Sequence, residues 1–135
     1  MKIIICLDDA SGMAFNRRRQ SRDRRVLEDI SGMTEGATLY VAPYSARLLS
    51  EAGMSFCESG DMLAEAGEGD YCFFETEAPT LCDGVGALVI YRWNRRYPAD
   101  LYFTEDIAAA GLRLESTEEF EGYSHEKITK EVYVR

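Results

Sequence analysis

The side chain best suited to chemistry is Asp23, which lies in a polar stretch leading into a predicted helix. Ser21 is a good N-cap for that helix, and Asp23 then recurs with Leu27 and Ile30 at helical spacing. This register puts the carboxylate on the apolar face of the helix, pointing inward. There it can hold a protonated heterocycle or act as a base. The alternative is an acid in the first helical turn, favoured by the helix dipole and paired with a nearby arginine.

The single histidine, His125, lies in the segment Ser124-His125-Glu126-Lys127, between the last two predicted strands. An imidazole can act as acid or base in RNA cleavage, with a cationic side chain stabilising the phosphorane. The alternative is an exposed histidine in a hairpin turn. We therefore name Asp23 and His125 as candidate catalytic residues. A dinuclear zinc site needs several histidines, so we assign no metal ligands of that kind.

Two acids, Asp8 and Asp9, end the first apolar run of the chain. Carboxylates at the end of a buried strand can hold Mg²⁺, because this cation prefers oxygen ligands. The alternative is that both are polar loop residues that terminate the strand.

Arginines form two groups in a chain whose formal net charge is −9. Six of the nine residues from 17 to 25 are arginine, and the second group is Arg92, Arg95 and Arg96. If the groups meet, they form a local anion site on an acidic body. The alternative is a solvated surface neutralised by nearby acids. The net charge makes nucleic acid an unfavoured partner and predicts weak or absent RNA binding at physiological salt.

The elements that position these residues alternate between strands and helices. Lys2–Leu7 and Ala87–Tyr91 are apolar runs typical of strands that are buried on both faces. The other predicted elements are a loop over 8–20, a helix from Ser21 to near Gly32, a strand Thr38–Val41, a helix Pro43–Gly53, a strand Met54–Cys57, a short helix Met62–Ala66, a strand Tyr71–Glu75, and an antiparallel pair Leu112–Ser116 and Ile128–Val134. This order predicts a three-layer α/β/α fold with a mostly parallel central sheet and a C-terminal antiparallel strand pair.

Length and composition are those of one domain, because 135 residues with 46% hydrophobic content can bury a substantial core. We predict a single domain over residues 1–135. No apolar stretch is long enough to cross a membrane, and no signal peptide is recognisable. The four cysteines form no CxxC pair, which favours reduced thiols. These features predict a cytoplasmic protein that does not bind membranes, and they leave the oligomeric state open.

Several segments resemble dihydrofolate reductase. The first strand ends in an acidic pair, a loop with Gly12 follows, and Ser21-Arg22-Asp23 leads into the helix. The segments that resemble the closing strands of that family, in order and spacing, are Leu88–Asn94, Tyr97–Phe103, Leu112–Ser116, Phe120–Ser124 and Glu131–Arg135. The resemblance covers most of the chain and implies a short, divergent bacterial member of that fold family. It places Asp23 where the family keeps its pterin-binding carboxylate, and it retains the family's Ser/Thr position at Ser45.

The chain differs from that family where the cofactor binds. The resemblance implies that the pyrophosphate of NADPH lies partly on a Gly-Gly motif after a central strand, where glycines let the backbone approach the phosphates. The corresponding stretch here is Phe73–Glu77, which has neither glycine. Glu75 and Glu77 add two carboxylates that repel a phosphate. We therefore predict no useful NADPH binding, and we name no other cofactor.

The residues and the resemblance together favour binding of a small anionic or heterocyclic ligand in a cleft beside the first strand and first helix. One alternative is an active enzyme, either an NADPH-dependent reductase or an RNA-cleaving nuclease that uses the arginines and His125. Another is an acidic interaction or inhibitor protein with a basic partner. The sequence leaves open whether the protein is an enzyme. The candidate ligand-binding residues are Asp8, Asp9, Asn16, Arg17, Arg22, Tyr44, Ser45, Glu75, Arg92 and Asn94.

Overall fold

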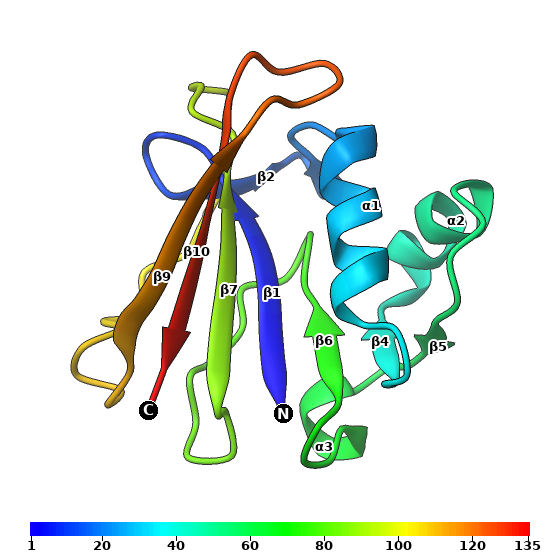
Figure 1. The fold of residues 1–135 in the computed structure, drawn as a ribbon, viewed down its shortest axis with the longest axis vertical. Coiled ribbons are helices and arrows are strands. Elements are labelled where there is room, and N and C mark those ends of the chain that lie inside the picture. The colour runs from blue at the N-terminus through cyan, green and yellow to red at the C-terminus, as the bar shows by residue number, and fades with distance from the viewer.

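A seven-stranded sheet forms the centre of the computed structural model, which describes residues 1–135 (Figure 1). The strand order is β5-β4-β6-β1-β7-β10-β9. The strands are β1 (Lys2–Leu7), β4 (Leu39–Val41), β5 (Cys57–Glu58), β6 (Tyr71–Phe73), β7 (Ala87–Arg92), β9 (Arg113–Phe120) and β10 (Ile128–Val134). β1 runs parallel to β6 and β7, whereas β10 is antiparallel to β7 and β9. The predicted mostly parallel sheet with a C-terminal antiparallel pair is confirmed.

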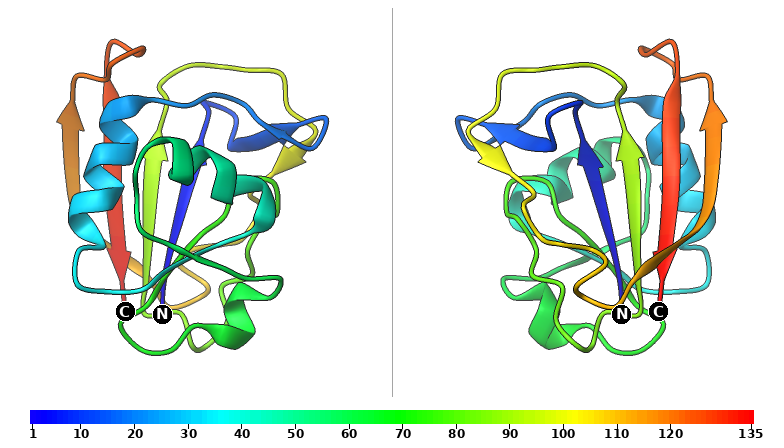
Figure 2. Two further views of the ribbon diagram at one scale, coloured as in Figure 1. Left: turned by 90° about the vertical axis from the view of Figure 1, so that its right-hand side faces the viewer. Right: turned by 90° about the vertical axis from the view of Figure 1, so that its left-hand side faces the viewer.

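Helices cover one face of this sheet, and a short helix and a small second sheet cover the other. Helices α1 (Arg24–Met33) and α2 (Pro43–Glu51) pack on one face. On the other face lie the short helix α3 (Met62–Glu65) and a small sheet, whose strands are β2 (Gly12–Phe15), β3 (Arg18–Arg19) and β8 (Leu101–Tyr102). The small sheet lies beside the carboxyl end of β1, at the end of the molecule where α1 begins (Figure 2). None of the three helices combines the length and apolar character that a membrane-spanning helix needs.

Successive residues of β1 point into two different cores, as the alternation of a strand requires. Ile4 belongs to a cluster with Val26 and Ile30 of α1, whereas Ile3 and Ile5 belong to the cluster on the opposite face. All three isoleucines are fully buried. Because both faces of β1 are covered, its sequence is continuously apolar, which is why this strand was predictable.

The predicted loop over 8–20 is wrong in part, because it contains the β2–β3 hairpin. Ala14 pairs with Arg19 and Phe15 pairs with Arg18, which leaves Asn16 and Arg17 as the two turn residues. Both have positive φ, at 54° and 62°. Such turns usually contain glycine, and its absence here removed the sequence signal for a hairpin.

The predicted start of the first helix is also wrong. Asp23, and not Ser21, is the N-cap, and its side chain accepts a hydrogen bond from the Arg25 N–H. Both residue types are good caps, so helical spacing alone did not decide between them. Asp23 therefore lies at the end of α1, outside its apolar face, while the Ser21 hydroxyl is free for another role.

The predicted strand Met54–Cys57 lies further along the chain, as the two-residue strand β5. Met54 and Phe56 instead pack against the core that contains α1 and α2. The apolar side chains that suggested a strand thus pack against the core from the connection between α2 and β5.

Candidate functional site

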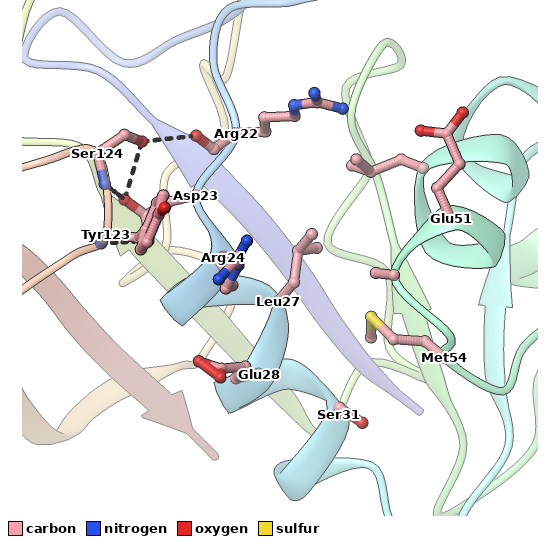
Figure 3. Close-up of a pocket in the computed structure, with 12 residues that line it drawn as sticks. Arg22, Asp23, Arg24, Leu27, Glu28, Ser31, Glu51, Met54, Tyr123 and Ser124 are labelled. Carbon is pink, nitrogen blue, oxygen red and sulfur yellow. Dashed lines mark hydrogen bonds between the residues drawn. The ribbon is translucent and has the colours of Figure 1, made fainter.

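Asp23 is the centre of the site, and its carboxylate is surrounded by hydrogen-bond donors. Oδ1 accepts from the N–H groups of Arg25 and Tyr123, at 2.8 and 2.9 Å. Oδ2 accepts from the Ser124 N–H at 2.9 Å and from the Ser124 hydroxyl at 3.2 Å (Figure 3). It also lies 2.9 Å from Nδ1 of His125. The Asp23 side chain is 0% exposed, so this carboxylate holds the β9–β10 hairpin tip to the start of α1.

The environment of Asp23 keeps its carboxylate ionised. Burial alone raises the pKa of Asp23, but the hydrogen bonds from Tyr123, His125 and Ser124 outweigh that effect and hold the pKa well below its usual range. An ionised carboxylate beside Nδ1 favours the His125 tautomer that carries its proton there. The other ring nitrogen, Nε2, is then an acceptor in the neutral imidazole.

Two hydroxyl groups converge on Nε2 of His125. The Tyr97 hydroxyl lies 2.8 Å away and the Ser21 hydroxyl 3.2 Å away. Tyr97 can also donate to Ser21, at 3.4 Å. The buried imidazole stacks on the indole of Trp93, with ring centroids 4.6 Å apart. In a series of hydroxyl, imidazole and carboxylate, the imidazole can take the hydroxyl proton while the ionised carboxylate orients the ring, which is the arrangement of general acid–base catalysis.

A groove of about 850 Å³ opens beside Asp23, between α1 and α2 (Figure 3). Leu27, Leu48 and Met54 supply apolar surface to it. Arg22 and Arg24 lie at the end nearest Asp23. The groove thus combines an apolar surface with a cationic end, which are the two features that a small amphipathic anion requires.

The glutamates that line this groove have basic neighbours, whereas its arginines have no acidic partner. Its two glutamates, Glu28 and Glu51, lie within 4 Å of Arg25 and Arg47, at 3.8 and 3.1 Å. The structure records no acidic partner for the groove arginines, Arg22 and Arg24, although the Arg24 guanidinium lies 4.4 Å from the ring centroid of Tyr123. The cations of the groove are therefore free to meet an anion.

A small cavity of about 10 Å³ continues the groove inward. The two share Arg22, Asp23, Leu27 and Leu48 as lining residues. The other walls of the cavity include Cys6, Ser21, Glu75 and Trp93. Ser21 thus lines a cavity that borders the groove.

Three predicted ligand-binding residues, Tyr44, Ser45 and Glu75, form a separate network with Arg19. The Arg19 guanidinium donates two hydrogen bonds to the Glu75 carboxylate, at 2.8 and 3.0 Å, and the Ser45 hydroxyl donates a third at 2.7 Å. The Tyr44 hydroxyl accepts from the Arg19 N–H, and the guanidinium lies 4.5 Å from the Tyr44 ring centroid. The Glu75 side chain is 7% exposed. This carboxylate is thus already paired inside the protein.

Asp8 organises the loop after β1. Its carboxylate accepts from the N–H groups of Ala10, Gly12 and Tyr97 and from the side-chain amide of Gln20, at 2.7 to 3.2 Å. Burial raises the pKa of Asp8, but these hydrogen bonds outweigh it and lower the pKa below its usual value. With four donors already bound, Asp8 has little capacity left for a cation.

The other predicted ligand-binding residues lie apart from the Asp23 site. Asp9 is exposed, and its N–H donates to the Arg95 carbonyl. Asn16 and Arg17 form the exposed turn of the β2–β3 hairpin. Arg92 pairs with Glu131 at 2.7 Å, and the Asn94 side chain donates to Lys127 and Thr129. Of the predicted residues, the structure brings together Asp23, His125 and Arg22, while Glu75 lines the small cavity beside them and Asn94 lines a separate pocket with His125.

Several residues of the site were not among the predicted ones. Ser21 was interpreted as a helix cap, and Tyr97 and Ser124 were given no site role. Ser124 precedes His125 in the sequence, which is a local signal that could have included it. Tyr97 is 28 residues from His125 along the chain and Ser21 is 104, so no local pattern indicates those contacts.

Comparison with known proteins gives a result at the level of fold. No family model matches the sequence, and no curated protein matches it significantly. The structure is similar to dihydrofolate reductase from Enterococcus faecalis, which was solved in complex with NADP(H) and RAB-propyl. The match has a TM-score of 0.69 and 13% sequence identity, and covers 99% of this chain and 95% of that one. The chain thus has the dihydrofolate reductase-like fold that its sequence predicts.

Proposed function

We propose that the protein binds a small anionic ligand with an apolar or heterocyclic body in the groove between α1 and α2. The observation that carries this proposal is the pairing pattern of the groove charges. Glu28 and Glu51 lie beside Arg25 and Arg47, whereas Arg22 and Arg24 have no acidic partner. A ligand anion placed there gains charge-assisted hydrogen bonds without separating an existing ion pair.

The place of the groove in the fold is one where small molecules commonly bind. The groove is bounded by α1 and α2, two helices on the same face of a mostly parallel sheet. Clefts at the carboxyl end of such a sheet commonly bind ligands. The similar structure from Enterococcus faecalis was solved with two small molecules. The apolar residues Leu27, Leu48 and Met54 can contact the body of the ligand, while Arg22 and Arg24 bind its anionic group.

NADPH, the cofactor that the fold implies, does not fit the residues present. The stretch after β6 is Phe74-Glu75-Thr76-Glu77, without the glycines that allow close approach to a pyrophosphate. Glu75 lies there as a buried carboxylate, bound to Arg19 and to Ser45 in the first turn of α2. The helix end that can neutralise a phosphate already faces an internal anion. We derive no reaction step that uses this cofactor.

A thermal-shift screen tests the binding proposal. Aromatic and heterocyclic carboxylates are compared with neutral amides of the same shape. At 100 times its dissociation constant, a bound carboxylate should add about 2.7 kcal/mol of stability. The double variant Arg22→Ala/Arg24→Ala should lose that stabilisation, while Arg113→Ala, an exposed arginine on β9, should keep it. Equal stabilisation by carboxylates and amides would contradict the proposal.

A further inference from the structure

Ser21 precedes α1 in the sequence but does not cap this helix. Asp23 caps α1, so the half-exposed Ser21 hydroxyl is not bound to the helix N-terminus. That hydroxyl lies 3.2 Å from Nε2 of His125, and Nδ1 of the same ring lies 2.9 Å from Asp23. A nucleophile within hydrogen-bond reach of a base, itself oriented by a third group, is the arrangement that defines covalent catalysis by serine.

We infer that Ser21, His125 and Asp23 form a catalytic triad that hydrolyses esters bound in the groove between α1 and α2. The inference rests on the proposed function, because the groove supplies the substrate site. Ser21 lines the small cavity, which shares Arg22, Leu27 and Leu48 with the groove and so joins Ser21 to the substrate site.

The surroundings of His125 hold it in the orientation that a base needs. Asp23 is buried and ionised, so it fixes the tautomer in which Nε2 can accept a proton. Trp93 stacks on the ring and prevents rotation out of line. With Nε2 unprotonated, the Tyr97 hydroxyl is its nearer donor, at 2.8 Å against 3.2 Å for Ser21, so Ser21 has to replace Tyr97 at the nitrogen lone pair before its proton is transferred. Once Nε2 carries the serine proton, the Tyr97 oxygen at 2.8 Å can accept a hydrogen bond from it.

The first turn of α1 has two N–H groups near the nucleophile that have no recorded acceptor. The Asp23 side chain and carbonyl accept from the N–H groups of Arg25 and Leu27. The structure records no acceptor for the N–H groups of Arg24 and Val26, and Val26 also lines the small cavity. These two N–H groups can donate to a carbonyl oxygen as negative charge develops on it, whereas the dipole of α1 already faces the Asp23 carboxylate.

The reaction balances with water as the only co-reactant. Ser21 Oγ bonds to the carbonyl carbon as its proton moves to Nε2 of His125. The ester C–O bond then breaks, and the leaving alcohol takes that proton. In the second half, water gives a proton to Nε2 and bonds to the acyl carbon, after which the acyl–Oγ bond breaks. The products are an alcohol and a carboxylic acid, and Ser21 recovers its proton.

The free arginines of the groove determine the substrate class. Arg22 and Arg24 favour esters that carry a second, anionic group, and the apolar surface around Leu27 and Leu48 favours a short hydrocarbon or aromatic part. We therefore expect mono-4-nitrophenyl succinate to be a better substrate than the neutral 4-nitrophenyl acetate.

Covalent labelling with a fluorophosphonate tests the nucleophile directly. Mass spectrometry of the labelled wild-type protein should place the phosphonate on Ser21. Ser21→Ala should abolish labelling and lower kcat/KM for the succinate ester about a thousandfold. Ser116→Ala is the matched control, because Ser116 is exposed on β9 and does not line the groove. It should change neither measurement.

The outcomes separate this inference from the binding proposal. If the wild type is not labelled, or if the label lies on another residue such as Tyr97, the triad is wrong, whatever the stability of the variants. Arg22→Ala/Arg24→Ala should raise KM for the succinate ester about tenfold and so reduce the preference for it over 4-nitrophenyl acetate. If Ser21→Ala still shows carboxylate-dependent stabilisation while the wild type fails to react, the groove binds ligand and Ser21 is not a nucleophile.

Discussion

Nδ1 of His125 lies 2.9 Å from Oδ2 of Asp23, although 102 residues separate them in the sequence. The contact joins two distant parts of the fold, the start of α1 and the tip of the β9–β10 hairpin. The same carboxylate also accepts from the backbone of Tyr123 and Ser124. Asp23 is thus a helix cap and a tertiary connection at once.

Asp23→Asn should lower the free energy of unfolding by more than about 2 kcal/mol. Asparagine is as good a cap as aspartate, so α1 keeps its start. Its oxygen can still accept from Arg25 and Tyr123, but the amide nitrogen that replaces Oδ2 cannot accept from Ser124 and His125, which leaves buried donors unpaired. The sequence predicts an inward carboxylate that can hold a ligand, whereas in the structure both oxygens of Asp23 already accept hydrogen bonds from the protein. Urea denaturation measures the difference.

Asp61→Asn is the matched control for that substitution. Asp61 caps α3 by accepting from the Ala64 N–H at 3.3 Å, in an exposed position. Asparagine can make the same hydrogen bond, so the urea midpoint should change little. If both variants lose the same stability, the cost lies in the cap and not in the contacts with the β9–β10 hairpin.

Acid should destabilise the protein through Asp8 and Asp23. The folded state lowers the pKa of both carboxyls below the ordinary value of 3.8, because each accepts several hydrogen bonds. A carboxyl with a lowered folded pKa contributes stability above its unfolded pKa, and that stability is lost as the pH falls. The contribution should therefore be constant down to about pH 5 and decline below about pH 4. Urea midpoints from pH 6 to pH 3 should fall more steeply for the wild type than for Asp23→Asn. Parallel curves would show that Asp23 titrates alike in both states.

The fold was predictable because its central strands carry a strong local signal. Lys2–Leu7 and Ala87–Tyr91 are buried on both faces, and their sequences are apolar without interruption. The β2–β3 hairpin was not predictable in this way, because its turn residues, Asn16 and Arg17, adopt positive φ without a glycine. Local sequence patterns therefore located the core of the sheet better than its polar edge.

The sequence identified Asp23 and His125 as candidate residues, but it did not predict that they contact each other. Asp23 and His125 were selected separately, one from helical spacing and the other as the single histidine. Their contact depends on how β9 and β10 place the hairpin tip against α1, which no periodicity within either segment encodes. Ser21 was assigned to the cap because serine and aspartate compete for that position with similar free energy.

NADPH should not bind in the micromolar range. The carboxylate of Glu75 is buried beside the first turn of α2, where it receives hydrogen bonds from Arg19 and Ser45. A phosphate placed there would face that charge or displace it from its partners. Titration calorimetry at physiological salt should give no measurable heat of binding, with an active dihydrofolate reductase as the positive control. A micromolar dissociation constant would revive the reductase alternative.

Gly122→Ala should destabilise the protein by about 1–3 kcal/mol, because the hairpin tip has no room for a side chain. A Cβ at Gly122 would lie 2.7 Å from Asp23 Oδ2 and 2.8 Å from the His125 carbonyl oxygen. Backbone must therefore move, and the donors of Tyr123 and Ser124 move with it. Urea denaturation measures the loss.

Gly32→Ala should stabilise the protein, although it is the same substitution that should destabilise it at Gly122. Gly32 lies within α1, and a Cβ added there would have no atom within 4 Å apart from its chain neighbours and the backbone of its own helix. Alanine there should raise stability by about 0.5–1 kcal/mol, because it reduces the freedom of the unfolded chain and favours helix. If Gly122→Ala were as stable as the wild type while Gly32→Ala gained stability, the hairpin tip would be able to withdraw from α1. The carboxylate of Asp23 would then not be the group that fixes its position.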